Sequence, residues 1–565
     1  MERSRVFSGF FGVILLLSLL AWIEYASLQG VFGYLSYLLL GITLVFPWLI
    51  PFIGIPLGIV DMFGLWNFRM YDVLLNLSHL SRSWLTLTYY WIMVFSSVLF
   101  QIILDFIIVR YLINRKNKEP RIMQNIAFIN CVIIDGNLDS DVVKDGYLVV
   151  EEGKIAGLGR MDAYEKRPGL DEIDLQGKYV LPGLINAHCH LAASGKPSNI
   201  WNLPDNIVKM LRRLLDLKIV KAIVYLSMKK NALTALNSGV TTVRSMGDLD
   251  FMDVKLRKET ESGRFLGPRL IVAGKTLCAT GGHGTLLGET ADSKVEIRKI
   301  IRTNLREEVD CIKIISTGGV MDARRVGEAG RPQMTVEEIE AACFEAHRGG
   351  LLVASHCESE KGIEEALDGG VDTIEHGAPI SDYALQLFKT NPKSLRGYSA
   401  IIPTISAGMG LATLPREITK ISEGAYANAK IVVRGSIEGL KRAYMEKVPI
   451  GVGTDASVPY NPHYDLWKEL KYFIHYTGMS AREAIHYATR MNAEILGIGH
   501  ITGSLERGKS ADLIVVDSNP LENIDTLGHI DKVIVRGILI DQPGFKRIKE
   551  LDDNPIKKPI DLKDE

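Results

Sequence analysis

Residues 181–191 read LPGLINAHCHL, and this stretch decides how the rest of the chain is interpreted. Its apolar residues predict a short strand that ends at His188. His188 and His190 are two residues apart, so on an extended backbone both imidazoles point to the same face. Two imidazoles on one face can hold one cation, but the pair alone does not distinguish a metal site from a structural role.

The region from 183 to 500 alternates short strands with helical stretches. Two of the helices begin with capping boxes, Thr335 with Glu338 and Ser480 with Glu483. Seven further strands are expected at 240–247, 269–274, 311–319, 351–357, 371–377, 401–406 and 449–455. Eight strand–helix units of this length predict an α/β fold, a (β/α)8 TIM-type barrel.

Polar residues stand out at the ends of these strands. His356, His376 and Asp455 end the fifth, sixth and eighth strands. Lys313 lies inside the fourth, between isoleucines, where burying an ammonium is costly. The C-terminal strand ends of a barrel share one face, and catalytic groups gather there. A single histidine at a strand end is usually structural, but the whole set, with His188 and His190, predicts a metal site.

Strand-rich pieces flank this central region on both sides. Residues 122–182 contain AFINCVIIDG and YLVVEEGKIAGLG, and residues 501–545 contain ADLIVVD and KVIVRGILI. We expect the two pieces to pair into one composite β-domain, a small β-sandwich, built from both ends of the chain. Residues 546–565 form a polar tail.

Residues 1–113 differ from the rest because they consist largely of apolar runs, at 6–23, 33–60 and 84–113. The runs predict an α-helical transmembrane region, with a cleaved signal peptide as the alternative for the first. Residues 114–121 are polar and form the expected linker. The basic residues around this linker favour a cytoplasmic catalytic domain. The sequence therefore predicts an integral membrane protein that contacts membrane lipids.

The overall composition narrows the range of partners. The formal net charge is -1, so no global charge favours nucleic acid. The six cysteines form no CxxC pair and no disulfide framework, which favours buried, reduced thiols. A small-molecule substrate is the expected partner, and a homo-oligomer is compatible with the sequence.

Taken in order, these motifs resemble those of the amidohydrolase superfamily. The matching stretches are LPGLINAHCHL, IKIISTGGVM around Lys313, ASHCES around His356, DTIEHG around His376 and GTDAS around Asp455. The resemblance covers about 122–545 and is strongest to the prolidase-like and imidazolonepropionase-like branch. Within that branch, the chain is similar to the binuclear Xaa-Pro or Xaa-Arg dipeptidases. Many relatives have aspartate where this chain has Asn186, a position outside the ligand set.

The resemblance implies a site with two divalent metal ions, and zinc suits imidazole and carboxylate ligands. His188, His190 and Asp455 would bind the first ion, and His356 and His376 the second. Lys313 would carry a CO2-derived carbamate that bridges the two ions. A metal-bridging hydroxide would attack the substrate, with Asp455 as general base. His283, in ATGGHG, would hold the carbonyl or the developing oxyanion.

This reading implies a membrane-anchored hydrolase that cleaves an amide bond in a dipeptide, an N-acyl amino acid or a related compound. A cyclic-amide or lactone hydrolase of the same superfamily is an alternative. Glu358, two residues after His356, leaves a deaminase of the same superfamily as a further alternative. A non-catalytic membrane binding protein is the alternative of another class.

Two further features bear on substrate access. Arg324, Arg325 and Arg331 lie in or near the loop after the fourth strand, where one of them could bind a substrate carboxylate. The stretch 206–226 is basic and has apolar residues at helical spacing. It is either an ordinary barrel helix or an amphipathic helix that rests on a membrane.

Overall fold

The structure is a computed structural model, and it describes residues 125–198, 213–215, 217–285, 288–556 and 559–560. The chain divides into two compact units, Met1–Glu119 and Pro120–Glu565, and every described residue belongs to the second. The predicted transmembrane region and its linker, residues 1–121, lie outside the described residues.

No helix in the described part of the chain is long and apolar enough to cross a membrane. The two longest described helices, α6 (Lys218–Asn237) and α14 (Glu423–Met445), both carry several charged side chains along their length. The fold prediction is corrected accordingly: the described residues form a mixed α/β fold without a membrane-spanning helix. The predicted integral-membrane localisation is corrected by the same finding.

The centre of the fold is a ring of parallel strands. Three pair in the order β6 (Leu184–Cys189), β7 (Val240–Ser245) and β8 (Arg269–Val272). A second sheet has the order β10-β9-β11-β12-β13-β14. Its strands are β9 (Leu277–Cys278), β10 (Glu289–Thr290), β11 (Cys311–Ile315), β12 (Leu352–Cys357), β13 (Thr373–His376) and β14 (Ala400–Ile402).

Backbone hydrogen bonds join the two sheets at both edges. On one edge, the residue before β11 donates to the last residue of β8 at 2.8 Å. On the other, the segment 449–456 runs between β14 and β6. The Gly451 N–H donates to Ile401 of β14 at 2.8 Å, and Val452 accepts from Ala187 of β6 at 2.9 Å. With β6, β7, β8, β11, β12, β13 and β14, this segment makes eight ring members and closes the ring, while β9 and β10 extend the sheet beside β11.

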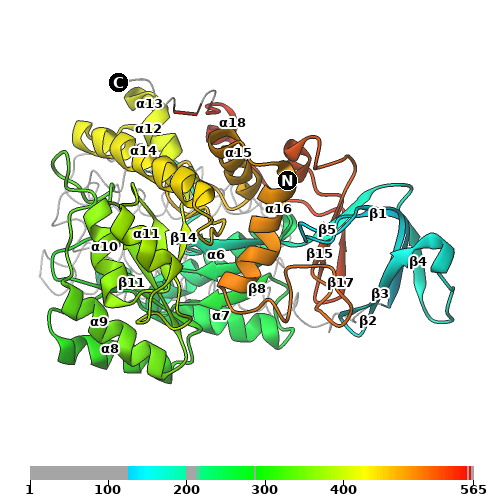
Figure 1. The fold of residues 1–565 in the computed structure, drawn as a ribbon, viewed down its shortest axis with the longest axis horizontal. Coiled ribbons are helices and arrows are strands. Elements are labelled where there is room, and N and C mark those ends of the chain that lie inside the picture. The colour runs from blue at the N-terminus through cyan, green and yellow to red at the C-terminus, as the bar shows by residue number, and fades with distance from the viewer. Residues whose placement is uncertain (1–124, 199–212, 216, 286–287, 557–558, 561–565) are drawn as a thin grey trace, which may run out of the picture. The chain divides into compact units, whose positions relative to one another are not determined.

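Helices cover the outside of the ring (Figure 1). They follow the strands in sequence, and both predicted capping boxes are present, at Thr335 and Ser480. Besides α6 and α14, the helices are α7 (Met252–Glu261), α8 (Lys294–Arg306), α9 (Val336–Arg348), α10 (Glu360–Gly369), α11 (Asp382–Lys389), α12 (Ile405–Thr413), α13 (Arg416–Thr419), α15 (Leu466–Thr477), α16 (Ala481–His486), α17 (Asn492–Ile495) and α18 (Lys549–Asp552). The predicted stretch 206–226 contains the start of α6, while its residues 206–212 lie outside the described residues.

The two flanks of the chain pair in one continuous eight-stranded sheet, drawn in cyan and in orange to red in Figure 1. Its strands are β1 (Ile126–Ile133), β2 (Val143–Glu151), β3 (Lys154–Arg160), β4 (Asp171–Asp174), β5 (Tyr179–Pro182), β15 (Leu513–Val516), β16 (Lys532–Val535) and β17 (Ile538–Asp541). Strand β5 pairs in parallel with β1 and antiparallel with β15. Because β5 joins both flanks, the sheet is unbroken, and the predicted pairing of the two ends of the chain in one β-domain is present.

Closure of the ring requires a glycine at 453. A Cβ atom on Gly453 would lie 2.7 Å from His188 Cβ and 2.7 Å from Ile402 Cγ2. We expect Gly453→Ala to destabilise the fold by about 1–3 kcal/mol through overpacking. The measurement is the midpoint of thermal unfolding of the full chain, which should fall by about 2–4 °C for each kcal/mol.

Gly157→Ala is the matched control, since a Cβ atom there meets nothing nearer than 4.0 Å. If Gly453→Ala unfolded at the same temperature as this control, the close approach of 449–456 to β6 would be refuted.

Candidate metal centre

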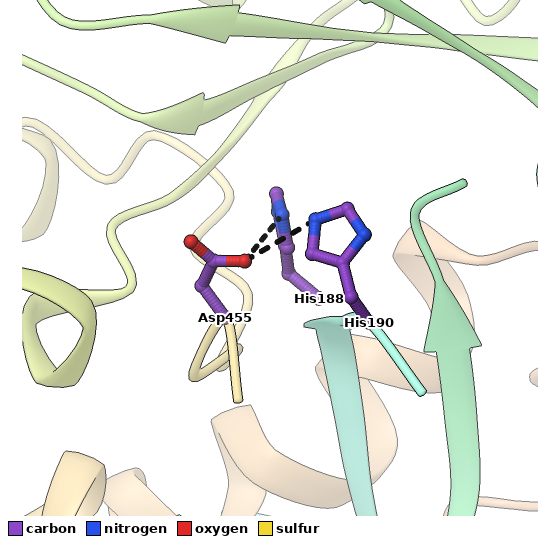
Figure 2. Close-up of side chains that lie close together, drawn as sticks. All are labelled: His188, His190 and Asp455. Atoms are coloured by element: carbon purple, nitrogen blue, oxygen red, sulfur yellow. Dashed lines mark ion pairs between the residues drawn. The ribbon is translucent and has the colours of Figure 1, made fainter. Parts of the chain in front are cut away.

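Three predicted ligands lie together at the C-terminal ends of neighbouring ring members. His188 is in β6, His190 follows that strand, and Asp455 is in the closing segment. The Nε2 atoms of both histidines lie 3.4 Å from Asp455 Oδ1 (Figure 2). Among the described residues, only this group brings three His, Cys, Asp or Glu donor atoms within 4.8 Å of one another.

The donor atoms of this group fit a cation. His188 Nε2 and Asp455 Oδ1 are buried, and neither has a hydrogen-bond partner among the described residues. Leaving buried polar atoms unsatisfied costs roughly 1–3 kcal/mol each. Two imidazole nitrogens and a carboxylate oxygen are ligands that zinc accepts. A divalent cation between them would satisfy the unpaired atoms of this group.

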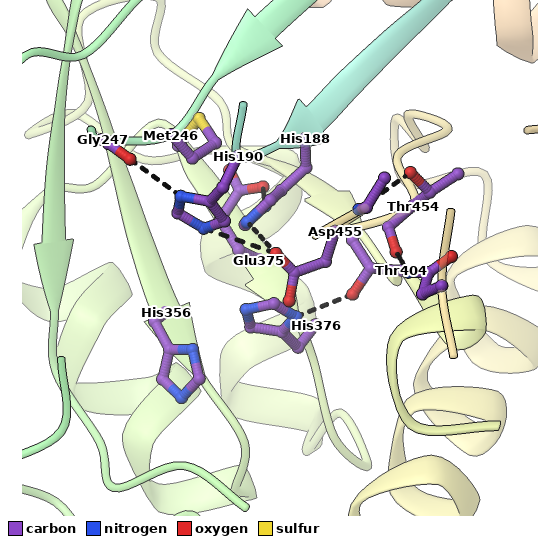
Figure 3. A network of polar contacts seen from close by, with 12 residues as sticks. His188, His190, Met246, Gly247, His356, Glu375, His376, Thr404, Thr454 and Asp455 are labelled. Atoms are coloured by element: carbon purple, nitrogen blue, oxygen red, sulfur yellow. Dashed lines mark hydrogen bonds and ion pairs between the residues drawn. The ribbon is translucent and has the colours of Figure 1, made fainter. Parts of the chain in front are cut away.

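Two further predicted ligands, His356 and His376, lie beside this group (Figure 3). The ring centroids of His188 and His376 are 4.9 Å apart, and those of His376 and His356 are 4.5 Å apart. Lys313 in β11 is only 3% exposed, and its charge acts on His356, His376 and Asp455. The structure thus places all six predicted ligands at one end of the ring.

Hydrogen bonds to the Nδ1 atoms fix how three of the histidines are turned. His188 Nδ1 lies 2.6 Å from Glu375 Oε2, His190 Nδ1 lies 2.8 Å from Gly247 O, and His376 Nδ1 lies 2.7 Å from Thr404 Oγ1. In each ring this leaves Nε2 as the atom available to a metal. Such partners set the tautomer and orientation of metal-binding histidines.

Two of these partners, Glu375 and Thr404, were not predicted from the sequence. Arg244, the cation that pairs with Glu375, was not predicted either. Arg244, buried in β7, donates to Glu375 at 2.7 Å, which holds the carboxylate against His188. The sequence did carry a signal for Arg244, because it lies in a strand mainly of valines and threonines, with no other charged residue. Glu375 directly precedes His376. On an extended strand, neighbouring side chains point to opposite faces, so the Glu375 side chain was not expected on the same side as His376. No pattern in the sequence pointed to Thr404 as a partner of His376.

The backbone at this end of the ring is locally strained. His376, Thr404 and Asp455 have φ angles of 68°, 46° and 56°, in the left-handed region. Non-glycine residues there cost on the order of 1–3 kcal/mol each and persist only when their surroundings hold them. At Thr404 the support is visible, since the next two backbone N–H groups both donate to the buried Glu469 carboxylate at 2.7 Å.

Burial changes the protonation of the candidate ligands. It lowers the pKa of His356 and of His376 well below the ordinary value, and neighbouring cationic groups lower both further. Burial also lowers the pKa of Lys313, although the charges of Glu375 and Asp455 oppose it. Burial alone would raise the pKa of Asp455, but the nearby His188 outweighs it and the pKa is lowered. Neutral imidazoles and an ionised carboxylate are the forms that bind metals.

His283 reaches the centre from the loop after β9. Its ring centroid lies 4.7 Å from that of His356, and its Nδ1 lies 2.6 Å from Asp322 Oδ2. Burial acts to lower the pKa of His283, but the hydrogen bond and charge of Asp322 outweigh it and raise the pKa. The side chains of Arg324, Arg325 and Arg331 are exposed.

Asn186 has a structural role at the closure of the ring. Its Oδ1 accepts from the backbone N–H groups of His188 and Thr454 at 3.2 and 3.1 Å. Its Nδ2 donates to Thr454 Oγ1 at 2.8 Å. These contacts join β6 to the closing segment, next to two of the candidate ligands.

Comparisons with known proteins agree with this geometry. A model of the amidohydrolase family matches residues 179–540. A solved structure described as a prolidase from Bifidobacterium longum is 37% identical, has a TM-score of 0.67, and covers 76% of this chain and 98% of its own. The structure of a Xaa-Pro dipeptidase with bound methionine is 30% identical, has a TM-score of 0.64, and covers 74% of this chain and 100% of its own.

Curated relatives are more distant and more varied. Ochratoxinase from Aspergillus niger is 25% identical over 417 residues, which are 68% of this chain and 80% of that protein. A 5-methylthioadenosine/S-adenosylhomocysteine deaminase from Bacillus cytotoxicus is 25% identical over 416 residues, which are 69% of this chain and 85% of that protein. These relatives include both a hydrolase-type enzyme and a deaminase.

The hydrogen bond from His376 to Thr404 can be tested separately. Where His376 serves as a metal ligand, as the sequence predicts, Thr404→Ala should weaken metal binding by about 10–100-fold, because the His376 ring loses the partner that orients it. Thr404→Ser keeps the hydroxyl and should bind metal like the unmodified protein. Metal titration of the apo-protein measures both, and equal affinities of the two variants would contradict the role of this hydrogen bond.

Proposed function

The chain belongs to the amidohydrolase family, and we propose that it is a binuclear metallohydrolase that cleaves an amide bond in a dipeptide or an N-acyl amino acid. That it is an enzyme acting on a carbon–nitrogen bond follows from the family and from its relatives. The observation that carries the finer proposal is the convergence of His188, His190 and Asp455 beside His356, His376 and Lys313. The similarity to a prolidase and to a Xaa-Pro dipeptidase supports a peptide-like substrate.

In this proposal, side chains already in place would hold two zinc ions. His188, His190 and Asp455 would hold the first, and His356 and His376 the second. When bound, such ions would supply a water of lowered pKa and polarise the scissile carbonyl. Asp455 takes the proton from the attacking water and returns it to the leaving nitrogen, so that the products are an acid and an amine. His283 holds the carbonyl oxygen of the substrate.

Lys313 completes the proposed centre as a carbamate. The lowered pKa of its buried amine favours the neutral form, which can attack CO2. The new N–C bond forms with release of one proton, and the lysine nitrogen then carries a carboxylate. This change would remove the difficulty of a buried ammonium, since nearby cations would compensate the charge of the carboxylate.

The carbamate predicts a specific phenotype for Lys313→Met. This change keeps the length and apolar stem of the side chain but cannot react with CO2. We expect the variant to lose one of the two ions and at least ~100-fold in kcat, the upper end for loss of groups that support a metal site. The unmodified apo-protein should regain activity on metal addition only when bicarbonate is present. Full metal content in the variant, or reactivation without bicarbonate, would exclude the carbamate.

Deamination is the second candidate, and Glu358 is the observation that favours it. Burial raises the pKa of this carboxyl group to about 8, so it is largely protonated at neutral pH. Its Oε2 atom is buried without a hydrogen-bond partner in the described structure. A protonated carboxyl group beside a metal centre can deliver a proton to a departing ammonia. The similarity to a deaminase is consistent with this alternative.

One experiment separates the two functions. The metal-loaded protein is incubated with a pooled library of dipeptides and N-acyl amino acids, and with aminopurine nucleosides, and products are read by mass spectrometry. We expect paired release of an acid and an amine, lost in the His188→Ala blank because the first ion loses a ligand. Release of ammonia alone would favour deamination. No product from either class would sink the amide proposal and leave lactones and cyclic amides to be tested.

A further inference from the structure

His283 is held from one side by the loop that follows β11, residues 316–335. Asp322 Oδ2 lies 2.6 Å from His283 Nδ1 and also accepts from the Gly284 N–H at 3.2 Å. Gln333 Oε1 accepts from the backbone N–H of His283 at 2.9 Å. The same loop thus fixes both the backbone and the ring of His283, across a sequence separation of 39 to 50 residues.

The position of the ring is also fixed by the absence of a side chain at Gly319. A Cβ atom there would lie 2.5 Å from His283 Nε2. With Nδ1 engaged by Asp322, Nε2 is the ring nitrogen that Asp322 leaves available, and the ring packs at 4.7 Å from the ring of His356. The His283 ring is therefore held in place by the Asp322 carboxylate at Nδ1 and by the close approach of Gly319 at Nε2.

The loop that provides these contacts is itself anchored. Gly318 donates to Arg331 at 2.8 Å and accepts from Gly330 at 2.9 Å, which closes the base of the loop. Its tip is held by Asn428 of α14, which accepts from Gly327 at 2.9 Å and donates to Arg325 O at 2.8 Å. Asp322 thus lies on a supported element and can act as a fixed partner.

We infer that Asp322 is a positioning residue, which holds His283 so that Nε2 faces the reacting carbonyl over the His356–His376 position. The inference rests on the proposed function, because it takes from that function the role of His283 at the substrate carbonyl. Asp322 itself contacts neither metal ligand nor substrate in this arrangement. Its effect passes through His283, so the two residues should behave as one unit when both are changed.

A double-mutant cycle on the full metal-loaded protein tests this unit. We expect Asp322→Ala to lower kcat about 10–100-fold, the range found when partners that orient metal-site histidines are lost. KM and metal content should stay unchanged. His283→Ala should have a similar effect, and the double variant should be no slower than His283→Ala alone, because residues that act together are not additive. Asp322→Asn, which keeps an acceptor for Nδ1, should recover part of kcat.

Two more variants separate positioning from loop stability. Glu328→Gln is the matched control, since Glu328 lies on the same loop but accepts from Arg324 and Arg325 backbone groups rather than from His283. It should leave kcat within twofold of the unmodified protein. Gly319→Ala should reproduce the defect of Asp322→Ala by pushing the ring from its other side. Multiplicative losses in the double variant, or a loss of metal in Asp322→Ala, would overturn the inference.

Proton NMR tests the hydrogen bond between His283 and Asp322 directly and needs no substrate. A hydrogen bond of this length should give a downfield Nδ1–H signal that disappears in both Asp322→Ala and His283→Ala. If the unmodified protein cleaves no amide but shows this signal, the proposed function fails while the pairing stands. If the signal is absent from the unmodified protein, the inference fails whatever the substrate is.

Discussion

The arrangement of the candidate metal centre depends on how the ring of strands is closed. The carbonyl oxygen of His188 accepts the backbone N–H groups of Thr454 and Asp455 at 3.1 and 2.8 Å. These bonds tie a ligand of the first ring member to a ligand of the last, across more than half of the barrel sequence. Because the backbones are joined at this point, the His188 imidazole and the Asp455 carboxylate cannot separate without opening the ring. Asn186 bridges the same junction through its hydrogen bonds. Gly453 allows the close approach of the two backbones because it has no side chain.

Behind this junction lies a buried chain of charges. Arg244 and Glu375 are 1% and 0% exposed, and Glu375 also takes a hydrogen bond from the Thr373 hydroxyl at 2.5 Å. Burial by itself would raise the pKa of Glu375, but Arg244 and His188 hold it far below the ordinary value. The carboxylate therefore stays ionised and keeps His188 turned toward the cation position. Breaking such a pair leaves an unpaired buried charge and typically costs about 3–5 kcal/mol.

Much of this arrangement could be predicted from the sequence, because local patterns carry it. The strand period places His188 and His190 on one face, and the strand ends locate His356, His376 and Asp455. Lys313 was visible as a charge among isoleucines. The partners Thr404 and Asp322 were not predictable, since each meets its histidine across 28 or 39 residues of chain and no spacing encodes that contact. The left-handed backbone at His376 depends on the same tertiary surroundings. The pairing of β5 with one partner from each flank was not predictable in detail, because it is a property of the whole sheet and not of either flank.

The eight-stranded sheet also has a consequence for the order in which the protein can be completed during synthesis. Strand β5 precedes the barrel, yet one of its two edges stays open until β15 has been made, more than 300 residues later. A ribosome adds roughly 5–20 residues each second, so this edge waits on the order of tens of seconds without its partner. Unpaired strand edges of this kind are open to wrong partners while they wait. The same delay applies to Asp455, which joins His188 and His190 only when most of the chain has already emerged.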